Sequence, residues 1–318
     1  MKAFVLAAGL GTRLRPLTDH LPKPLIPVLN IPSLFYTLFL LKQAGIREII
    51  CNIHHHAEAI QNFVKASNLP DMDISFSEEP VILGTGGGLK KCEKLLGADE
   101  FLLVNSDIIT DIDFGALIRH HQESGRGGTL TLYETPKAAA IGSVGIEEGL
   151  VKDFRNQRYT GLVSSFIYTG TAVLSPEIFR FMKAEFSGIV DTGFTGLIDN
   201  GGLSYYQHKG LWMDIGTMQS FWQANINSAS VITDLGDQMN LAIGTRPHAI
   251  SPEAVISPDA EIFCSVIGKG CYIGPKSIIR NSVLLSGAEV KSGSTIINAV
   301  VDHYSTIVME EPEHKRKN

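Results

Sequence analysis

Residues 6–27 read LAAGLGTRLRPLTDHLPKPLIP. They overlap an apolar run, Ala3–Ala8, which predicts a buried first strand. Glycines at positions 9 and 11 let the backbone after that strand turn sharply and approach a ligand closely. The cations that follow are Arg13, Arg15 and Lys23. Exposed backbone amides and fixed cations at the end of a strand are suited to bind a polyphosphate.

Two widespread phosphate-binding loops do not match this stretch. The Walker loop has Gly-Lys-Ser/Thr after its glycines, whereas Gly11-Thr12-Arg13 stands here. The dinucleotide fingerprint has a third glycine where this chain has Leu14. Judged locally, the stretch is therefore compatible with a phosphate loop and also with a solvated turn between a strand and a helix.

As a whole, the stretch resembles the long signature of the sugar-1-phosphate nucleotidyltransferases, the NDP-sugar pyrophosphorylases. Further motifs of this family stand at Gly84–Gly88, Asn105–Asp107 and Trp212–Thr217. The resemblance extends over residues 1–230, and the chain is similar to bacterial mannose-1-phosphate guanylyltransferases. It implies an enzyme that supplies NDP-sugars, for example for cell-envelope polysaccharides, and whose partners are an NTP and a sugar 1-phosphate.

Composition narrows the possible partners. The chain has 318 residues, of which 44% are hydrophobic and 19% charged, so it can bury a full core. Its net charge of −6 argues against a general nucleic-acid surface. The longest apolar stretch, Leu34–Leu41, is far shorter than the roughly 20 residues that a membrane span needs. We expect a cytoplasmic protein without a signal peptide and without a membrane or nucleic-acid partner.

The first half of the chain alternates between strand and helix patterns. The expected strands are Ala3–Ala8, Glu48–Ile53, Ile74–Ser77, Phe101–Val104 and Thr129–Tyr133. The expected helices include Ser33–Ala44 and Ala57–Ala66. This alternation predicts an α/β, Rossmann-like nucleotidyltransferase domain with a mixed, largely parallel sheet. Ligands bind such sheets at the carboxyl ends of the strands, where the glycine loop and Asp107 both fall.

The pattern becomes richer in strands after residue 140. Strands or hairpin parts are expected at Gly142–Gly149, Tyr168–Leu174 and Leu203–Gln207. A helix is expected to close the domain within Trp212–Ala229, and residues 233–249 are predicted to be a linker. The family resemblance implies that this second half binds the sugar.

The last part of the chain contains a repeat. Aliphatic residues recur at positions 250, 256, 262, 267, 273, 279, 284, 290, 296, 301 and 307. The spacing of 17 residues from Ile262 to Ile279 recurs from Ile279 to Ile296. This pattern predicts a short left-handed parallel β-helix of hexapeptide turns. The predicted domains are residues 1–232 for nucleotidyl transfer, 233–249 as linker, 250–308 as β-helix and 309–318 as charged tail.

The resemblance implies attack of a sugar 1-phosphate oxygen on the α-phosphorus of the NTP, with pyrophosphate as the leaving group. Such a reaction needs positioning and charge neutralisation rather than a protein nucleophile. The family's metal positions correspond to Asp107 and Asp214, so the implied cofactor is Mg²⁺. From the residues alone, a turn aspartate at 107 and a helix cap at 214 are the alternatives. Asp113 is better explained as the cap of a helix that begins at Phe114.

The same resemblance assigns roles around the phosphates and the base. Arg13 corresponds to the signature arginine at the leaving β- and γ-phosphates, and Lys23 to the lysine near the α-phosphate, so both are implied catalytic residues together with Asp107. Arg15 is either a further phosphate ligand or a salt-bridged scaffold residue. A carboxylate at Glu79 accepts the two N–H groups of a guanine edge better than it fits uracil, which favours GTP. The implied nucleotide-binding residues are Ala7, Ala8, Gly9, Gly11, Thr12, Glu79, Gly84, Thr85 and Gly86.

The sugar side departs from the family. The implied sugar contacts are Gly145, Tyr168, Thr169 and Gly170. Many members carry Glu-Lys-Pro where this chain has Asn156-Gln157-Arg158, so the usual sugar carboxylate and phosphate lysine are missing. The substitutes open to consideration are Lys152, Arg155 and Arg158. Mannose 1-phosphate with GTP is our preferred pair, and N-acetylmuramate 1-phosphate with UTP is the nearest alternative.

Three other interpretations are weighed against this one. A non-catalytic regulatory relative is disfavoured, because such relatives lose the loop arginine or the metal aspartates that this chain keeps. Acyl transfer by the β-helix is disfavoured, because its roughly three coils carry neither a long loop nor an evident catalytic histidine, His303 being the only histidine deep in the repeat. The run His54–His56 is better explained as a surface turn than as a metal site. We expect the β-helix to serve assembly into a homo-oligomer.

Overall fold

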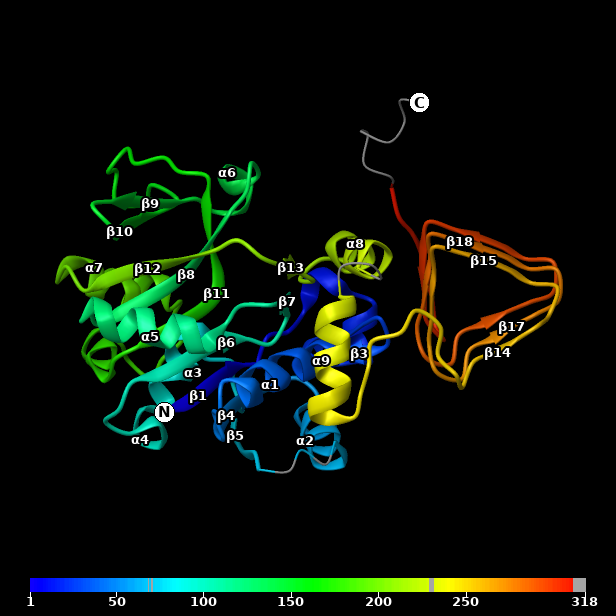
Figure 1. The fold of residues 1–318 in the computed structure, drawn as a ribbon, viewed down its shortest axis with the longest axis horizontal. Coiled ribbons are helices and arrows are strands. Elements are labelled where there is room, and N and C mark those ends of the chain that lie inside the picture. Colours follow the sequence, from blue (N-terminus) through cyan, green and yellow to red (C-terminus); the bar gives the residue numbers. More distant parts are fainter. Residues whose placement is uncertain (68, 70, 229–231, 311–318) are drawn as a thin grey trace. The chain divides into compact units, whose positions relative to one another are not determined.

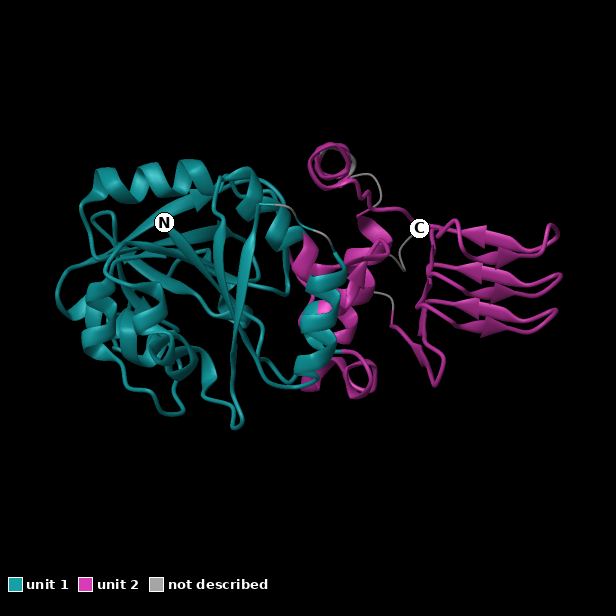
Figure 2. Cartoon of the chain, turned by 90° about the horizontal axis from the view of Figure 1, so that it is seen from below, with its two compact units in different colours: residues 1–10, 22–24, 36–212 teal, residues 11–21, 25–35, 213–318 magenta. Residues whose placement is uncertain are grey.

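The computed structural model describes residues 1–67, 69, 71–228 and 232–310. Its internal contacts divide the chain into two compact units, which Figure 2 separates by colour. Unit 1 comprises residues 1–10, 22–24 and 36–212, and unit 2 comprises residues 11–21, 25–35 and 213–318. The signature stretch at the N-terminus therefore contributes to both units.

Unit 1 is built on a nine-stranded sheet with the order β5-β4-β1-β6-β11-β8-β12-β10-β9 (Figure 1). Its strands are β1 (Lys2–Leu6), β4 (Glu48–Ile53), β5 (Asp73–Glu78), β6 (Phe101–Asn105), β8 (Gly128–Glu134), β9 (Val144–Glu147), β10 (Leu150–Phe154), β11 (Phe166–Leu174) and β12 (Leu203–His208). The neighbouring strands β5, β4, β1 and β6 are all parallel, whereas β11 is antiparallel to both β6 and β8. The sheet is thus mixed, as predicted, with a continuous parallel part from β5 to β6 and mostly antiparallel pairs beyond it.

Apolar side chains from the central strands form the core of unit 1. Phe4, Leu103 and Leu130 are fully buried, in agreement with the apolar runs of the sequence. The strands that we predict agree with the observed ones to within two residues at each end, and Glu48–Ile53 has the predicted bounds. Because β1 and β6 pair in parallel with Leu6 opposite Asn105, the residues that follow these two strands lie side by side.

Helices and short segments connect the strands. They are η3 (Lys23–Leu25), α1 (Ser33–Gln43), α2 (Ala57–Ala66), α3 (Gly84–Lys91), α4 (Glu93–Leu96), β7 (Ile108–Thr110), α5 (Phe114–Ser124), α6 (Ala138–Ile141), η4 (Pro176–Phe181), η5 (Val190–Phe194) and α7 (Thr195–Asp199). The glycines of the motif Gly84–Gly88 form the first part of α3. Asp113 caps α5 as predicted, because its carboxylate accepts a hydrogen bond of 2.9 Å from the Ala116 amide.

Unit 2 begins with the loop that carries Arg13. Its non-repeat elements are η1 (Thr12–Leu14), η2 (Leu17–Asp19), β2 (Pro27–Val28), β3 (Ile31–Pro32), α8 (Met218–Asn227) and α9 (Thr233–Ile243), and β13 (Trp212–Asp214) leads into it. The helix predicted within Trp212–Ala229 is α8, which follows β13 and begins after the Thr217 cap, whose hydroxyl accepts the Ser220 amide. Ala229 lies outside the described residues.

The segment 233–249, which we predict to be a linker, contains α9. Leu235 and Met239 stand one helical turn apart in α9, and both are buried. Gly244 ends the helix in the left-handed conformation, with a φ of 66°. The linker prediction missed this helix because Gly236 and the polar residues around it weaken the apolar pattern.

The C-terminal part of unit 2 is a parallel β-helix. Its strands are β14 (Val255–Ile256), β15 (Glu261–Phe263), β16 (Val266–Ile267), β17 (Tyr272–Ile273), β18 (Ile278–Arg280), β19 (Val283–Leu284), β20 (Glu289–Val290), β21 (Thr295–Ile297), β22 (Ala299–Val301) and β23 (Thr306–Val308). They form three sheets, and in Figure 1 the coils have a triangular outline.

The register of the β-helix confirms the repeat found in the sequence. Ile262 pairs with Ile279, and Ile279 pairs with Ile296, so each coil contains 17 residues. Inward-facing aliphatic side chains such as Ile273 and Leu284 are fully buried. The antiparallel strand β23 closes the last coil at Val308. Most of the predicted charged tail, residues 311–318, lies outside the described residues.

The helices that the structure describes are short. Among the residues that the structure describes, no helix has the length and apolar character that crossing a membrane requires. The apolar stretch Leu34–Leu41 belongs to α1, whose side chains are nearly all buried within the protein.

Candidate active site

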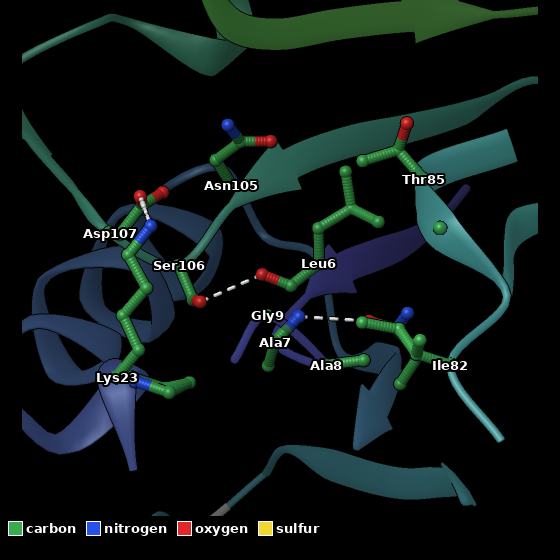
Figure 3. Close-up of a pocket in the computed structure, with 13 residues that line it drawn as sticks. Leu6, Ala7, Ala8, Gly9, Lys23, Ile82, Thr85, Asn105, Ser106 and Asp107 are labelled. Atoms are coloured by element: carbon green, nitrogen blue, oxygen red, sulfur yellow. Dashed lines mark hydrogen bonds and ion pairs between the residues drawn. The ribbon is translucent and has the colours of Figure 1, made fainter. Parts of the chain in front are cut away.

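A first cavity of about 190 Å³ lies at the carboxyl ends of β1 and β6 in unit 1 (Figure 3). Ser106 fixes this edge, because its hydroxyl donates a hydrogen bond of 2.7 Å to the Leu6 carbonyl oxygen. The cavity is lined by Leu6, Ala7, Ala8, Gly9, Lys23, Pro24, Asn52, Ile82, Gly84, Thr85, Asn105, Ser106 and Asp107. Seven of the residues predicted for the nucleotide and the catalysis are thus brought together here: Ala7, Ala8, Gly9, Lys23, Gly84, Thr85 and Asp107.

Lys23 and Asp107 form an ion pair on one wall of the first cavity (Figure 3). Their side chains are 16% and 14% exposed, so both charges are largely removed from water. Opposite charges in a site of low polarity interact more strongly than they do at a surface. The pair therefore holds a cation and a carboxylate in fixed positions beside the backbone of Ala7–Gly9.

Asn52 is a wall residue that sequence analysis missed. Its side-chain oxygen accepts the Ala7 amide at 2.8 Å, and its amide group donates to Glu79 Oε1 at 2.8 Å. Asn52 is buried at 2% exposure in the otherwise apolar strand β4. A lone amide inside an apolar strand is the sequence signal that could have identified it, because buried polar side chains need partners.

Glu79 does not line the first cavity, although we predict it to accept a base. It is 1% exposed, and its second carboxylate oxygen accepts the Leu83 amide at 2.8 Å. A buried carboxylate must be satisfied by donors, and both of its oxygens are engaged within the protein. In this structure Glu79 therefore supports the cavity wall through Asn52 and the loop before α3.

The glycines of α3 have two roles: one lines the first cavity, and others allow a second segment to pack closely. Gly84 lines the first cavity in the left-handed conformation, with a φ of 69°. Gly86, another predicted nucleotide ligand, instead packs against residues 187 and 188, and its amide donates to the Ser187 carbonyl oxygen at 2.8 Å. A Cβ at Gly87 would lie only 2.0 Å from the Glu185 carbonyl oxygen. The missing side chains thus allow a second segment to cover the helix.

A second cavity of about 340 Å³ shares Thr85 with the first. Its walls combine apolar residues with a few polar ones, which is typical of sites for small molecules. It is lined by Thr85, Ile141, Gly142, Phe154, Arg155, Gln157, Ile167, Tyr168, Gly188, Ile189, Val190 and Asp191. Of the residues predicted to contact a sugar, Tyr168 is the one found in this cavity.

The other predicted sugar contacts lie behind the cavities. Gly145 packs in the β9–β10 hairpin, where an added Cβ would lie 3.0 Å from the Asp153 side chain. The glycine that lines the second cavity is Gly142. The Thr169 hydroxyl donates to the Thr131 carbonyl oxygen at 2.9 Å. Gly170 packs against Asn105, since a Cβ there would lie 2.7 Å from the Asn105 amide nitrogen. Gly170 therefore positions a residue of the first cavity.

Tyr168 brings a buried hydroxyl to the wall of the second cavity. Burial raises the pKa of this phenol, so the hydroxyl stays protonated and can act as a donor. Its ring meets Phe194 edge to face, with a centroid distance of 5.5 Å. Among the described residues the Tyr168 hydroxyl has no hydrogen-bond partner, which is unusual for a buried polar atom.

In unit 2, the remaining predicted residues lie around Gly216. A Cβ at Gly216 would lie 3.0 Å from a guanidinium nitrogen of Arg13 and 2.8 Å from Asp214 Oδ1. The Gly216 amide donates to the same Asp214 oxygen at 2.7 Å. The side chains of Arg13 and Asp214 thus both lie close to the bare backbone of Gly216.

The loop that carries Arg13 is folded by Gly11 and Thr18. Gly11 has a φ of 64°, and its carbonyl oxygen accepts the Leu14 amide and the Thr18 hydroxyl, each at 2.8 Å. Thr12 is the first residue of η1. Arg15 pairs with Asp19 at 3.1 Å, which agrees with the scaffold role among its two predicted alternatives.

No cluster of three or more His, Cys, Asp or Glu side chains suited to a metal occurs among the described residues. His54 bonds the Glu79 carbonyl oxygen at 2.6 Å, and His56 precedes α2 in the left-handed conformation. The histidine run is thus a turn before a helix, as we predict.

Asp107 and Asp214 provide carboxylates of the kind that Mg²⁺ uses, since it binds through one or two carboxylates plus phosphate oxygens.

Both parts of the chain match known protein families. A family model described as "Nucleotidyl transferase" matches residues 2–230, and one described as "GlmU-like, C-terminal hexapeptide" matches residues 235–311. The mannose-1-phosphate guanylyltransferase catalytic subunit beta of Danio rerio is 30% identical over 96% of this chain and 87% of its own length. The mannose-1-phosphate guanyltransferase of Hypocrea jecorina is 28% identical over the same shares.

Solved structures share the fold. HddC from Yersinia pseudotuberculosis, complexed with GMP-PN, matches with a TM-score of 0.59 and 23% identity. The match covers 71% of this chain and 98% of that protein. At this identity the likeness concerns the fold alone.

Proposed function

Because the chain belongs to the nucleotidyl transferase family, we propose that it transfers a guanylyl group from GTP to mannose 1-phosphate, giving GDP-mannose and pyrophosphate. The observation that carries this proposal is the Lys23–Asp107 pair in a cavity lined by the backbone of Ala7–Gly9 and Gly84. This arrangement offers a fixed cation to phosphate groups and a carboxylate to a metal ion. The names of the curated relatives support the choice of GTP and mannose.

The proposed reaction forms one O–P bond and breaks another. A sugar 1-phosphate oxygen attacks the α-phosphorus of the NTP. The bond from the α-phosphorus to the bridging oxygen breaks, and pyrophosphate leaves. The attacking phosphate is already ionised, so no general base is needed. Lys23 is proposed to neutralise charge near the α-phosphate, and Arg13 to neutralise charge on the leaving phosphates, through interactions that grow as the transition state forms.

Mg²⁺ is the proposed cofactor, held by the carboxylates of Asp107 and Asp214. The donors around Asp107 suit a hard cation, because the Asn105 amide and the Ser106 hydroxyl line the same cavity. When bound, the ion supplies positive charge to the phosphate oxygens. Lys23 holds one oxygen of Asp107 and so orients that carboxylate.

The β-helix is proposed to serve assembly rather than chemistry. The residues that we propose for catalysis all precede residue 220, and the repeat of unit 2 begins at β14. Stacked coils present flat outer faces that suit self-association. The proposed enzyme is accordingly a homo-oligomer that acts on NTP and sugar 1-phosphate in the cytoplasm.

The proposed function is tested by pyrophosphate release over a matrix of four NTPs and several sugar 1-phosphates. The highest kcat/KM is expected for GTP with mannose 1-phosphate. A higher value for UTP with N-acetylmuramate 1-phosphate would replace the substrates but keep the reaction. Absence of pyrophosphate release with every pair, in protein that unfolds cooperatively, would contradict the reaction itself.

A further inference from the structure

Three cations of the segment 152–158 are candidates to replace the missing family lysine, and the structure separates them. Arg155 lines the second cavity. Arg158 forms an ion pair with Asp199 instead. Neither Arg158 nor Lys152 is among the lining residues of that cavity. Arg155 is thus the cation of this segment that faces the space next to Thr85.

The backbone of Arg155 is held in an unusual conformation. Arg155 and Asn156 have φ values of 55° and 54°, in the left-handed region that non-glycine residues seldom adopt. The Arg155 amide donates to the Ser143 carbonyl oxygen at 2.8 Å. Strained residues of this kind persist only where the surroundings fix them, and they cluster at ligand sites. Here they form the centre of a tight turn, which the Gln157 amide closes by donating to the Phe154 carbonyl oxygen at 3.0 Å.

Asp153 fixes the loop that follows Arg155. Its buried carboxylate accepts the Arg158 amide at 3.1 Å, and it accepts the Thr160 hydroxyl at 2.8 Å and the Thr160 amide at 3.3 Å. A carboxylate that collects backbone donors in this way closes a turn. The loop around Arg155 is therefore anchored from the core of the hairpin, although its surface is exposed.

The side chain of Arg155 is positioned by Gly142. One guanidinium nitrogen of Arg155 donates to the Ile141 carbonyl oxygen at 3.2 Å. A Cβ at Gly142 would lie 2.6 Å from Arg155 Nε, so the guanidinium lies directly across the bare glycine backbone. An arginine has five N–H donors in a fixed fork, and this contact uses one of them. The other donors are available to an occupant of the cavity.

The guanidinium of Arg155 is exposed and is not paired with another charged group of the second cavity. Asp191 lines the same cavity, yet among the described residues Arg155 takes part in no ion pair. Gln157 and Tyr168 add neutral groups to the lining. An arginine with free donors at a partly apolar cavity is suited to bind an anionic group.

We propose that Arg155 is the residue that binds an anionic group of the sugar 1-phosphate in the second cavity. The proposal rests on the proposed function, because it takes the second cavity as the site of the sugar substrate. The anion has two possible sources: the 1-phosphate itself, or a carboxylate carried by the sugar. Arg155 would then take over, from a different position, the task of the family lysine.

The test compares four proteins: the wild type, Arg155→Ala, Arg155→Lys and the control Arg158→Ala. KM is measured by pyrophosphate release with mannose 1-phosphate and with mannuronate 1-phosphate, which adds a carboxylate. An inhibition constant replaces KM for a compound that is not turned over. If Arg155 binds the 1-phosphate, Arg155→Ala raises both constants at least ~10-fold, as expected for a lost charge-assisted hydrogen bond. If it binds a carboxylate, only the mannuronate constant rises.

The other variants make the assignment specific. Arg155→Lys should recover part of the affinity, because the charge is kept while the fork is lost. Gly142→Ala should raise the same constant with the arginine still present, because the new methyl group displaces the guanidinium. The KM for the NTP should stay the same in all of them. Thermal unfolding of each variant verifies that the loop change leaves the fold intact.

Two results would overturn the proposal. One is an unchanged constant for both sugar 1-phosphates in Arg155→Ala. The other is an equal rise in Arg158→Ala, which would indicate a general charge effect of the loop. A wild type that releases no pyrophosphate with any substrate pair contradicts the proposed function, whereas an active wild type with an unaffected Arg155→Ala contradicts only this inference.

Discussion

Polar groups that form or support the wall of the first cavity are buried and bonded, whereas the charged groups that line the second cavity are exposed. Asn52, Glu79 and Asp107 are each held by at least one hydrogen bond or ion pair within the protein. Arg155, Gln157 and Asp191 are exposed in the second cavity. The difference places rigid geometry beside the proposed reacting phosphates and adaptable geometry beside the sugar.

Physical reasons favour this division. Charge stabilisation in a transition state is effective when the donors are oriented before the reaction begins, and buried bonded groups satisfy that requirement. Loops on a rigid scaffold can change their side chains with little effect on the fold. One scaffold can thus keep its phosphate chemistry while it exchanges the residues that recognise the sugar.

The largest effect is expected from Asp107→Asn. Loss of a proposed metal ligand where charge develops should lower kcat at least ~10²-fold, with every sugar 1-phosphate affected alike. Steady-state pyrophosphate release at saturating Mg²⁺ measures the change, and the melting temperature checks the fold. A rate near that of the wild type would contradict the proposal that the reaction takes place in the first cavity. Asp214→Asn is expected to behave in the same way.

A smaller and more selective effect is expected from Glu79→Ala. The change leaves the Asn52 amide and the Leu83 amide without their buried acceptor, at a cost of about 1–3 kcal/mol. We expect KM for the NTP to rise about 10-fold while KM for the sugar 1-phosphate stays the same. Glu78→Ala, which alters the exposed neighbouring carboxylate, is the matched control. A rise in both KM values would mean that Glu79 stabilises the walls of both cavities.

The first cavity was largely predictable from the sequence because its residues follow strands. The apolar runs locate β1 and β6, and their parallel pairing places Gly9 and Asp107 at one edge of the sheet. Asn52 was missed, since nothing in a single sequence indicates which way one amide in an apolar strand points. Glu79 was recognised as special, but the donors that engage both of its oxygens come from separate segments that only the fold brings together.

The second cavity was less predictable because it depends on loop conformation. Gly145 and Gly142 are equally plausible in the sequence, and only the hairpin register shows which of them faces the cavity. The left-handed backbone of Arg155 has no signal in its residue type. The β-helix is the opposite case, because the 17-residue spacing of its aliphatic residues is visible in the sequence and equals the register of its strand pairs.

A smaller effect than that of Glu79→Ala is expected from a substitution in the second cavity. Asp191→Asn keeps the shape of the side chain and removes its charge, so a hydrogen bond to a sugar hydroxyl is weakened rather than lost. KM for the sugar 1-phosphate should rise about two- to tenfold, with kcat and the NTP KM unchanged. Asp199→Asn, in which the altered carboxylate pairs with Arg158 outside the cavity, serves as the control. A hundredfold loss of kcat in Asp191→Asn would make this wall as critical as the first cavity and would break the comparison.

The smallest effect is expected from Tyr304→Ala in unit 2. The ring of Tyr304 lies 4.1 Å from that of His20, at the end of the loop that carries Arg13, so the last coil of the β-helix supports this loop. Both rings are exposed, and pairs of this kind contribute about 0.5–1.5 kcal/mol at most. We expect KM for the NTP to rise about twofold, with Tyr304→Phe unaffected and the sugar KM unchanged. If Tyr304→Ala instead lowered kcat as strongly as Asp107→Asn, the β-helix would be part of the catalytic site, and the division between a catalytic domain and an assembly domain would have to be abandoned.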